Sequence, residues 1–312
     1  MADVSVVIPT HNRRRLLGQT LWSALAQRGV DFEVLVVDDG STDGTADGLA
    51  ALGDHRVRLL RHEHPRGVAT ARNTGVAAAR GAWVAFLDDD DLWAPDKLAR
   101  QLDAARAAGR DWVYAGAVEV DGAGRLLGGT PPLPPDALLA GLTRHNPMPA
   151  GSSNVMVRAG LLADTGGFDP TLRHLADWDL WLRLARLSRP TCVAAPLVAY
   201  RIHPGQATMD TTGMVAEARV LQARHGADPG AIHRWAAWSQ LRSGRRWAAV
   251  AAYAAAVRTG DIASVARSAV ALLSPRPTLT RRPRRRAATA PDWHLAAQAW
   301  LEKLAGAEGA RR

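Results

Sequence analysis

The most informative part of this sequence is Trp83-Val84-Ala85-Phe86-Leu87-Asp88-Asp89-Asp90-Asp91-Leu92-Trp93. Five apolar residues run directly into four carboxylates, as expected of a buried strand that ends at a polar edge. Adjacent like charges repel one another unless a cation compensates them. Mg²⁺ is commonly held by one or two carboxylates together with substrate phosphates. The run therefore indicates a metal site, and a solvated acidic turn before the next helix is the alternative.

Length and composition indicate an ordinary soluble globular protein. The chain has 312 residues, of which 47% are hydrophobic and 22% charged, enough for one large domain and an appendage. Its single cysteine, Cys192, excludes an internal disulfide framework and suggests a reducing compartment. The N-terminus enters strand-like sequence without a basic segment, and no window reaches the roughly 18 apolar residues of a membrane span. We therefore expect a cytoplasmic protein without a signal peptide.

The positive charge is concentrated in the C-terminal third. Residues 1–212 carry 22 Lys and Arg against 24 Asp and Glu, whereas residues 213–312 carry 17 against 6. A basic run at Arg281–Arg286 favours a solvated tail or a peripheral contact with the inner face of a membrane. No recognition motif accompanies the charge, so nucleic acid is not an expected partner.

The first 110 residues or so alternate between strand and helix patterns. Apolar segments at 4–8, 32–37, 57–60 and 83–87 are separated by helical patterns, which predicts an α/β fold with a doubly wound, mostly parallel sheet. Ligands bind such sheets at the carboxyl ends of the strands. Polar clusters follow three of these strands: Thr10-His11-Asn12, Asp38-Asp39 and Asp88–Asp91. Phosphate-binding glycine loops are absent, so a bound nucleotide would be held by carboxylates and a metal.

The rest of the chain divides into a section of mixed helix and strand patterns and a section of helical patterns only. Residues 111–212 mix helices with strands predicted at 112–118, 153–157, 193–195 and 197–202, and the Gly- and Pro-rich segment 128–136 is predicted to be a mobile loop. Beyond residue 213 we expect helices only, at 214–225, 230–243, 246–258 and 261–273. The predicted organisation is a main domain at 1–212 with halves 1–110 and 111–212, a helical extension at 213–273, a Pro- and Arg-rich linker at 274–290, and a final helix and tail at 291–312.

A set of motifs occurs in a fixed order along residues 3–205. They are Val4-Ser5-Val6-Val7-Ile8-Pro9-Thr10-His11-Asn12-Arg13, Val36-Val37-Asp38-Asp39-Gly40-Ser41-Thr42-Asp43, Ala71-Arg72-Asn73, Phe86-Leu87-Asp88-Asp89-Asp90-Asp91, Gly166-Gly167-Phe168-Asp169 and Asp177-Trp178-Asp179-Leu180-Trp181-Leu182-Arg183. This set resembles the family 2 glycosyltransferases of GT-A fold, the nucleotide-diphospho-sugar transferase fold. The C-terminal hundred residues lie outside the resemblance and add a helical region.

The resemblance implies an inverting glycosyltransferase that depends on a divalent metal, Mg²⁺ or Mn²⁺. The expected donor is a nucleotide-sugar, a UDP-sugar first of all. The expected acceptor is a hydroxyl of a glycan, a lipid-linked glycan or a natural product, as in polysaccharide biosynthesis.

The resemblance also implies roles for individual residues. The nucleotide-sugar would be bound by Pro9, Thr10, Asn12, Asp39, Arg72 and Asp89. Asp88 and Asp90 would be the metal pair, while Asp91 is interpreted as structural. Asp177 would be the catalytic base, although Ala176 stands where the family commonly has Glu. Asp179 is the rival base, but we interpret it as a helix N-cap, and His203 is a further candidate near the diphosphate or metal.

Other interpretations stay open at this point. A sugar-phosphate nucleotidyltransferase uses a similar sheet and metal, but it normally has a Gly-rich basic loop where this chain has Pro9-Thr10-His11-Asn12. The chain could also be a non-catalytic scaffold of the same fold, in which the C-terminal helices carry the function. Trp93 and Trp178 flank the predicted site and are candidates for stacking on a sugar. His62 and His64 flank Glu63 as in a metal site, but we predict that they lie in a solvated loop.

Overall fold

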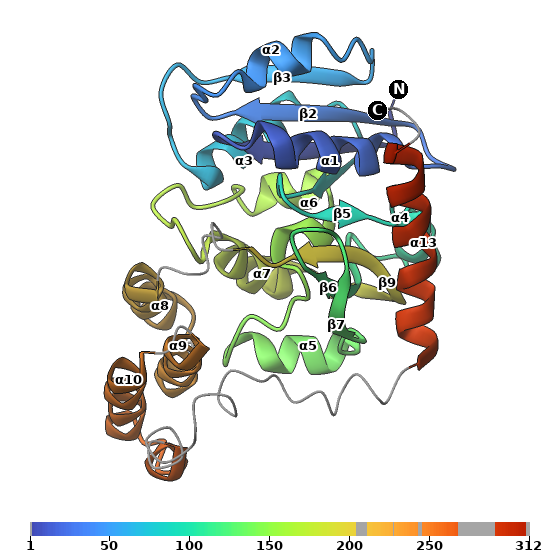
Figure 1. Cartoon of the computed structure of the whole chain (residues 1–312). Helices are drawn as coiled ribbons and strands as arrows, with labels where there is room; N and C mark the ends of the chain where they lie inside the picture. Colours follow the sequence, from blue (N-terminus) through green and yellow to red (C-terminus); the bar gives the residue numbers. More distant parts are fainter. Residues whose placement is uncertain (1, 204–210, 227, 243–244, 268–290, 310–312) are drawn as a thin grey trace.

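The computed structural model describes residues 2–203, 211–226, 228–242, 245–267 and 291–309 (Figure 1). Nine strands of this part form one sheet in the order β3-β2-β1-β4-β8-β6-β9-β5, with β7 paired to β6. The first four strands are all parallel and have nearly unbroken apolar sequences: β1 (Val4–Thr10), β2 (Phe32–Asp38), β3 (Val57–Arg61) and β4 (Trp83–Phe86). The predicted doubly wound architecture is confirmed in this half.

The second half of the sheet is mixed. Its strands are β5 (Leu92–Trp93), β6 (Trp112–Val120), β7 (Leu126–Thr130), β8 (Met156–Arg158) and β9 (Thr191–Arg201). Only β6 and β9 pair in parallel, and the remaining pairs are antiparallel.

Three local predictions in this half were wrong. The segment 128–136 is not a loop throughout, because it contributes to β7 and to helix α5 (Pro135–Leu142). The predicted strand 153–157 begins as a 3₁₀ helix, η1 (Gly151–Asn154), before β8. The two predicted closing strands are the single strand β9, whose pairing with β6 shifts register near Gly116.

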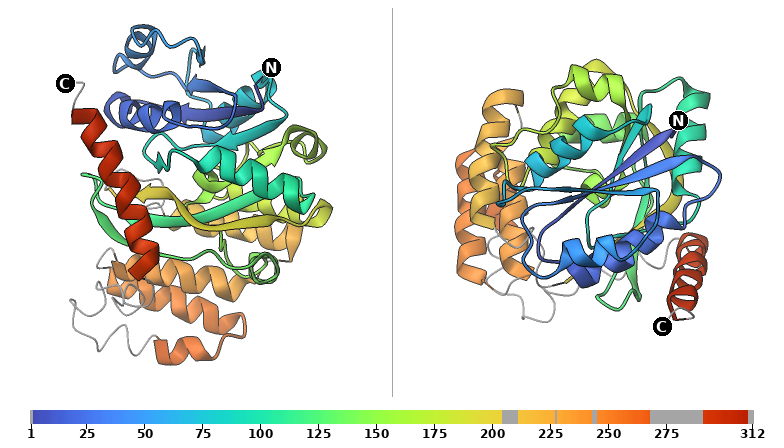
Figure 2. Two further views of the ribbon diagram at one scale, coloured as in Figure 1. Left: turned by 90° about the vertical axis from the view of Figure 1, so that its right-hand side faces the viewer. Right: turned by 90° about the horizontal axis from the view of Figure 1, so that it is seen from above.

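The sheet separates two apolar cores, because side chains alternate along each strand. Val4, Val6 and Ile8 of β1 face the core under α1 (Arg14–Leu25), α2 (Thr45–Ala50), α4 (Lys97–Ala108) and α13 (Pro291–Gly309). Val7 faces the opposite core under α3 (Val68–Ala78), α5, α6 (Ala159–Asp164), α7 (Ala176–Leu187) and α8 (Thr211–His225). Figure 2 shows α13 and α8 on different sides of the sheet.

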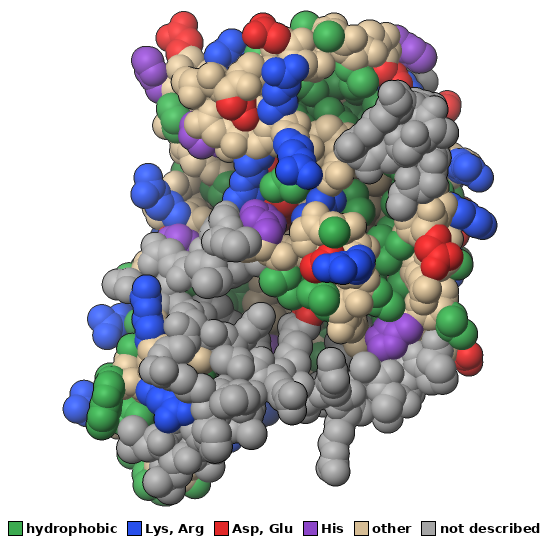
Figure 3. Space-filling model, viewed as in Figure 1, with side chains coloured by type: hydrophobic (Ala, Val, Ile, Leu, Met, Phe, Trp, Pro, Cys, Tyr) green, Lys and Arg blue, Asp and Glu red, His purple; other side chains and the backbone are tan. Residues whose placement is uncertain are grey.

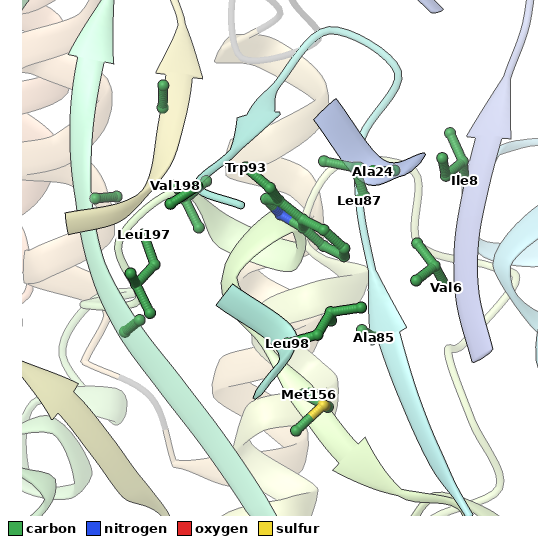
Figure 4. Packing of buried hydrophobic residues seen from close by; sticks show 14 of the residues in the cluster. Val6, Ile8, Ala24, Ala85, Leu87, Trp93, Leu98, Met156, Leu197 and Val198 are labelled. Atoms are coloured by element: carbon green, nitrogen blue, oxygen red, sulfur yellow. The ribbon is translucent and has the colours of Figure 1, made fainter. Parts of the chain in front are cut away.

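The two tryptophans beside the acidic run belong to these cores. Trp93 is fully buried among residues of β1, β4 and β9 (Figure 4), and its indole N–H donates to the Ser153 carbonyl over 2.7 Å. Trp178 is also buried and donates to the Leu142 carbonyl over 2.7 Å. Both residues are therefore core residues, and the alternative that they stack on a sugar is excluded because neither ring is accessible.

The helical extension follows the sheet. After α8 come α9 (Pro229–Arg242) and α10 (Arg246–Arg258), which pack on each other through a small cluster that includes Leu241 and Tyr253. Residues 263–267 are helical, while the rest of the helix predicted to 273 and the predicted linker 274–290 lie outside the described residues. Within the described ranges, no helix combines the length and apolarity needed to cross a bilayer.

Candidate functional site

The strand order reverses between β1 and β4, and the polar residues predicted from sequence meet there. The chain runs outward from β1 through β2 to β3 and then returns to β4 on the other side of β1. Such a switch point leaves a crevice at the carboxyl ends of the strands. Thr10 ends β1 next to buried Pro9, and its hydroxyl donates to Asp89 Oδ2 over 2.7 Å. The first and fourth strands are thereby joined at the site.

The four carboxylates of the acidic run have different environments. Asp88 pairs with Arg72 at 2.6 Å and keeps 31% of its side chain exposed. Asp90 accepts from Arg13 at 2.6 Å and lies 2.9 Å from His203. Asp91 is fully buried and serves the fold, because it accepts from Ser153 Oγ at 2.6 Å and from the Arg201 backbone N–H at 2.9 Å.

Asp89 is the residue of the run most affected by its neighbours. Burial, followed by the adjacent charge of Asp90, raises the pKa of Asp89 to about 7, against the opposing effects of Arg13 and the Thr10 hydroxyl. Arg13 lies 3.1 Å from Asp89 as well as 2.6 Å from Asp90, so one guanidinium bridges both carboxylates. The repulsion expected within the run is thus partly compensated by protein cations.

The end of β2 is tied to the loop before α3. Asp39 accepts from the backbone N–H groups of Arg66 and Gly67 at 2.8 Å and lies 2.6 Å from His62 Nδ1. His62 is buried rather than solvated, so the prediction for this residue was wrong. Asn12 adopts a left-handed backbone with φ of 52°, and its side-chain Oδ1 accepts from the Thr42 backbone N–H at 2.8 Å. The loops after β1 and β2 are therefore joined.

The Ala-Arg-Asn motif on α3 connects the acidic run to the second half of the chain. The Arg72 guanidinium pairs with Asp88 and lies 5.1 Å from the centre of the Phe168 ring. Asn73 exchanges two hydrogen bonds with the Phe168 backbone, at 2.7 and 2.9 Å. Gly75 lets α3 approach β1, because a Cβ there would lie 2.4 Å from Val7 Cγ1.

Asp177 lies in the first turn of α7, at the edge of the same site. Its carboxylate accepts from Asn146 Nδ2 at 3.1 Å and from the Trp178 backbone N–H at 2.7 Å. Burial raises the pKa of Asp177, the positive charge of Arg72 opposes the rise, and the charge of Asp88 adds to it. The 3₁₀ helix η1 links Asp177 to the acidic run, because a Cβ on Gly151 would lie 3.1 Å from Asp177 Oδ2 and Ser153 accepts from the Asp88 backbone N–H at 3.0 Å.

Asp179 is directed away from this site. It is buried, pairs with Arg183 at 2.8 Å, and lies 2.8 Å from His225 Nε2 on α8. Because α7 begins at Ala176, Asp179 lies inside the first turn and is not the N-cap that the sequence predicted. The structure thus assigns Asp179 to the α7–α8 contact.

Comparisons with known proteins identify the family. The model of glycosyl transferase family 2 matches residues 5–164, which is half of the chain. The chain belongs to glycosyl transferase family 2. This family assignment agrees with the motif order and with the switch-point site.

Two curated relatives match the N-terminal region. Succinoglycan biosynthesis protein ExoO of Rhizobium meliloti is 48% identical over 107 residues, which are 34% of this chain and 31% of that protein. The Escherichia coli protein WfgD, named a UDP-Glc:alpha-D-GlcNAc-diphosphoundecaprenol beta-1,3-glucosyltransferase, is 38% identical over 99 residues, or 32% of this chain and 39% of that one. The matched region spans well under half the length of either relative.

A solved structure matches almost the whole chain of this family 2 member. It is mannosyltransferase PcManGT from Pyrobaculum calidifontis, in complex with GDP-Man and Mn²⁺. The TM-score is 0.56 at 22% identity, and the match covers 97% of this chain and 86% of that one. The fold is therefore of GT-A type, as the sequence predicted.

The donor atoms at the switch point fit a divalent cation that is shared with a diphosphate. Among the described residues, no three His, Cys, Asp or Glu side chains are grouped as ligands of one ion. Mg²⁺ and Mn²⁺ are nevertheless commonly held by one or two carboxylates, with phosphate oxygens and water completing the shell. Asp90 and His203 present two ligand atoms 2.9 Å apart, and Asp88 is the most exposed carboxylate of the run. A metal held here would replace the charge that Arg13 and Arg72 now supply.

A sizeable groove of the described structure lies elsewhere. It measures about 1170 Å³ and lies between α1, α2 and α13, where it is lined by residues that include Leu21, Trp22 and Trp300. This groove lies beside the core that contains Val4, Val6 and Ile8, and not at the switch point. None of the predicted site residues lines it. We therefore assign the site from the chemistry at the strand ends and not from the size of the hollow.

Sequence reasoning did not assign roles to three residues of the site. Arg13 bridges Asp89 and Asp90, and the only signal was its place at the end of the first motif. Ser153 accepts from the Asp88 backbone N–H at 3.0 Å while donating to Asp91. Asn146 donates to Asp177 from a loop without a recognisable pattern.

Proposed function

We propose that this family 2 protein transfers a sugar from a nucleotide-sugar, specifically a UDP-sugar, to an acceptor hydroxyl with inversion at the anomeric carbon. The observation that carries the proposal is the meeting of Arg72, Asp88 and Asp90 at the switch point with Asp177 in electrostatic range. This arrangement offers cations and metal ligands for a diphosphate on one side and a carboxylate base on the other.

In the proposed reaction, Asp177 accepts the proton of the acceptor hydroxyl as that oxygen attacks the anomeric carbon. The bond between the anomeric carbon and the diphosphate oxygen breaks, and the nucleoside diphosphate leaves with that electron pair. Burial raises the pKa of Asp177, which makes its carboxylate a stronger base than an ordinary aspartate. A single carboxylate without a covalent nucleophile leads to one displacement and therefore to inversion.

The residues at the strand ends are proposed to hold the donor. Pro9, Thr10 and Asn12 would line the nucleotide, and Asp39 would bind its base and ribose through the acceptor capacity left after its internal hydrogen bonds. Asp89 would contact the ribose. The buried Arg72 would contact the diphosphate, and its Nε has no hydrogen-bond partner within the described structure.

A divalent ion, Mg²⁺ or Mn²⁺, is proposed at Asp88 and Asp90 with His203 beside them. When bound, such an ion neutralises developing charge on the diphosphate leaving group. Asp88 and Asp90 would hold it from the protein side with His203 as a further candidate ligand, and Arg13 would then turn toward the phosphates. The Mn²⁺ present in the PcManGT structure supports this proposal.

The acceptor is proposed to be a glycan, lipid-linked or natural-product hydroxyl. The lipid-linked class is supported by the name of WfgD, which acts on a diphosphoundecaprenol-linked sugar. The acceptor would approach from η1 and the N-terminus of α7, where Asn146 and Gly151 adjoin Asp177.

The donor can be tested first by thermal unfolding with UDP-glucose, UDP-N-acetylglucosamine, GDP-mannose and TDP-glucose, each with and without Mn²⁺. A ligand at 100 times its Kd stabilises the folded state by about 2.7 kcal/mol. We expect the largest rise in Tm with a UDP-sugar plus Mn²⁺. No rise with any of the four donors would contradict the proposal.

The base can be tested with Asp177→Asn. We expect turnover of the best donor to fall about 10²–10⁴-fold, while the rise in Tm on donor binding is kept. Because the folded-state pKa is raised, ionisation of Asp177 costs stability above that pKa, so the variant should be at least as stable at pH 8. Asp103→Asn, an exposed position on α4, is the control. Unchanged turnover in Asp177→Asn would exclude Asp177 as the base.

The helical extension is proposed to make a peripheral contact with an anionic membrane. Trp247 is 78% and Ile262 77% exposed, and the nearby Arg245, Arg258 and Arg267 are exposed as well. Figure 3 shows apolar and basic side chains close together in the region of α10. We expect sedimentation with vesicles that contain phosphatidylglycerol and not with pure phosphatidylcholine, and we expect Trp247→Ser to weaken it. Equal binding to both vesicles, or to neither, would exclude this contact.

A further inference from the structure

The first helix of the extension contacts the N-terminus of the helix that carries Asp177. Glu217 on α8 accepts three backbone hydrogen bonds, from Arg173 at 2.7 Å, His174 at 2.8 Å and Leu175 at 2.9 Å. Leu175 is the N-cap of α7 and has no side-chain oxygen to accept from the first turn. The Glu217 carboxylate therefore caps this helix N-terminus in place of a local side chain, although it lies 42 to 44 residues further along the chain.

The rest of α8 keeps this carboxylate in place. Met214, Ala218 and Leu221 lie on one face of α8, at i, i+4 and i+7, and are buried in the same core as residues of α7. At the other end of α8, His225 lies 2.8 Å from Asp179, which is two residues beyond Asp177. Helix α8 thus holds α7 on both sides of the proposed base.

Backbone position matters for Asp177 because its side chain is short. The carboxylate is separated from the α7 backbone by a single methylene, and one of its oxygens already accepts from the next backbone N–H, that of Trp178. A shift of residues 173–175 would therefore move the carboxylate directly. Displacement of a catalytic group by about 1 Å can cost on the order of 10²-fold in rate.

We propose that Glu217 is a positioning residue for Asp177, so that α8 completes the transferase site from outside the region matched by the family model. The proposal rests on the proposed function, because it takes Asp177 as the base. It gives the first helix of the extension a role in turnover that is separate from any part in binding the donor.

The test compares Glu217→Gln and Glu217→Ala with Arg219→Ala, an exposed position on the same helix. Turnover is measured with the UDP-sugar that stabilises the wild type most, in the presence of Mn²⁺. We expect kcat to fall at least about 10-fold in Glu217→Ala and less in Glu217→Gln, which keeps one acceptor oxygen. The donor Kd should not change, because Glu217 contacts none of the proposed donor ligands. Hydrogen exchange at the amides of 173–175 should quicken in the same order.

A double-mutant cycle separates positioning from general support of the fold. If Glu217 acts through Asp177, adding Glu217→Ala to Asp177→Asn should cost no further turnover. A further loss equal to that of the single variant, or wild-type kcat in both Glu217 variants, would overturn the proposal while leaving the proposed function intact. Full turnover in Asp177→Asn alone would instead exclude Asp177 as the base, and the positioning role with it, whereas the proposed function fails if the wild type turns over none of the donors.

Discussion

Helices α8 and α13 both lie outside the region matched by the family model, and they lie on opposite sides of the sheet (Figure 2). Helix α8 reaches α7 through charged groups, with Glu217 on backbone amides and His225 at Asp179. Helix α13 reaches β6 and β9 mainly through tryptophans, with Trp293 against Gly116 and Trp300 bonded to the Pro196 carbonyl at 2.9 Å. One contact lies next to the proposed base, and the other lies in the core that faces away from it.

The difference indicates that two helices added to the same fold can have different roles. Polar contacts to a helix N-terminus are directional and fix the position of a backbone. Apolar contacts to a sheet are not directional and mainly remove surface from water. We therefore expect changes in α13 to lower stability without lowering turnover per folded molecule, and we expect Glu217→Ala on α8 to lower turnover more than stability.

The largest stability effect is expected for Trp300→Ala. The side chain is 9% exposed and fills the interface between α13 and β9, so its loss should destabilise the protein by about 3–5 kcal/mol. Urea unfolding at 25 °C measures this. Leu295→Ala is the matched control on the same helix, since Leu295 is 61% exposed and its loss should change stability by less than about 0.5 kcal/mol.

The expected difference between α8 and α13 would be contradicted if Trp300→Ala lowered kcat per folded molecule as strongly as Glu217→Ala does. Such a result would mean that α13 also acts on the site, through β9 and the buried Asp91 that accepts from the Arg201 backbone. Turnover should be measured at a temperature where the variant is folded, as judged from its own unfolding curve.

A smaller effect is expected for Gly116→Ala. A Cβ at this position would lie 1.8 Å from Trp293 Cη2 and 2.9 Å from the Ala195 carbonyl oxygen, so α13 or the strand must shift. Overpacking of this kind costs about 1–3 kcal/mol. Gly128→Ala on β7 is the control, because a Cβ there meets nothing within 4 Å. The cost of Gly116→Ala should shrink in a Trp293→Leu background, and an unchanged cost would mean that the two residues do not clash.

The sequence was sufficient for the parts of the molecule that depend on local pattern. Continuous apolar runs predicted the parallel strands, and polar residues at their ends predicted the site around Thr10 and Asp88–Asp91. Gly109 follows the last residue of α4 and adopts φ of 60°, the left-handed conformation that favours glycine after a helix. These features were predictable because strand burial and helix ends are properties of a few neighbouring residues.

The parts that were missed depend on distant partners. His62 looked solvated because its partner Asp39 lies 23 residues away, and Asp179 looked like a cap because His225 is 46 residues away. Glu217 accepts only from backbone amides, which leave no mark in the side-chain sequence. The strand β7 was hidden by its glycines, because it is held to β6 by backbone pairing.

The smallest effect concerns the pair of Arg224 on α8 with Asp169, a contact peripheral to the site. Burial alone would raise the pKa of Asp169, but hydrogen bonds from Thr171 and Arg224 outweigh it and lower the pKa to about 2. The unfolded carboxyl titrates near 3.9. Because the folded-state pKa is the lower one, the pair stabilises the protein above about pH 4, and this stabilisation is lost as the pH falls toward 2. Arg224 is 43% exposed, so solvent screening limits the effect to about 1 kcal/mol.

Asp169→Asn should therefore lower the free energy of unfolding by about 1 kcal/mol at pH 6 and by almost nothing near pH 2. Arg224→Gln should lose stability over the same pH range, and the double variant should lose less than the sum of the two single losses, since the two variants share one interaction. Turnover at pH 7 should change much less than in Glu217→Ala, because neither residue contacts the backbone at 173–175. A large loss of turnover in Asp169→Asn would show that α8 positions Asp177 through this pair as well, and the role now given to Glu217 would have to be shared along the whole helix.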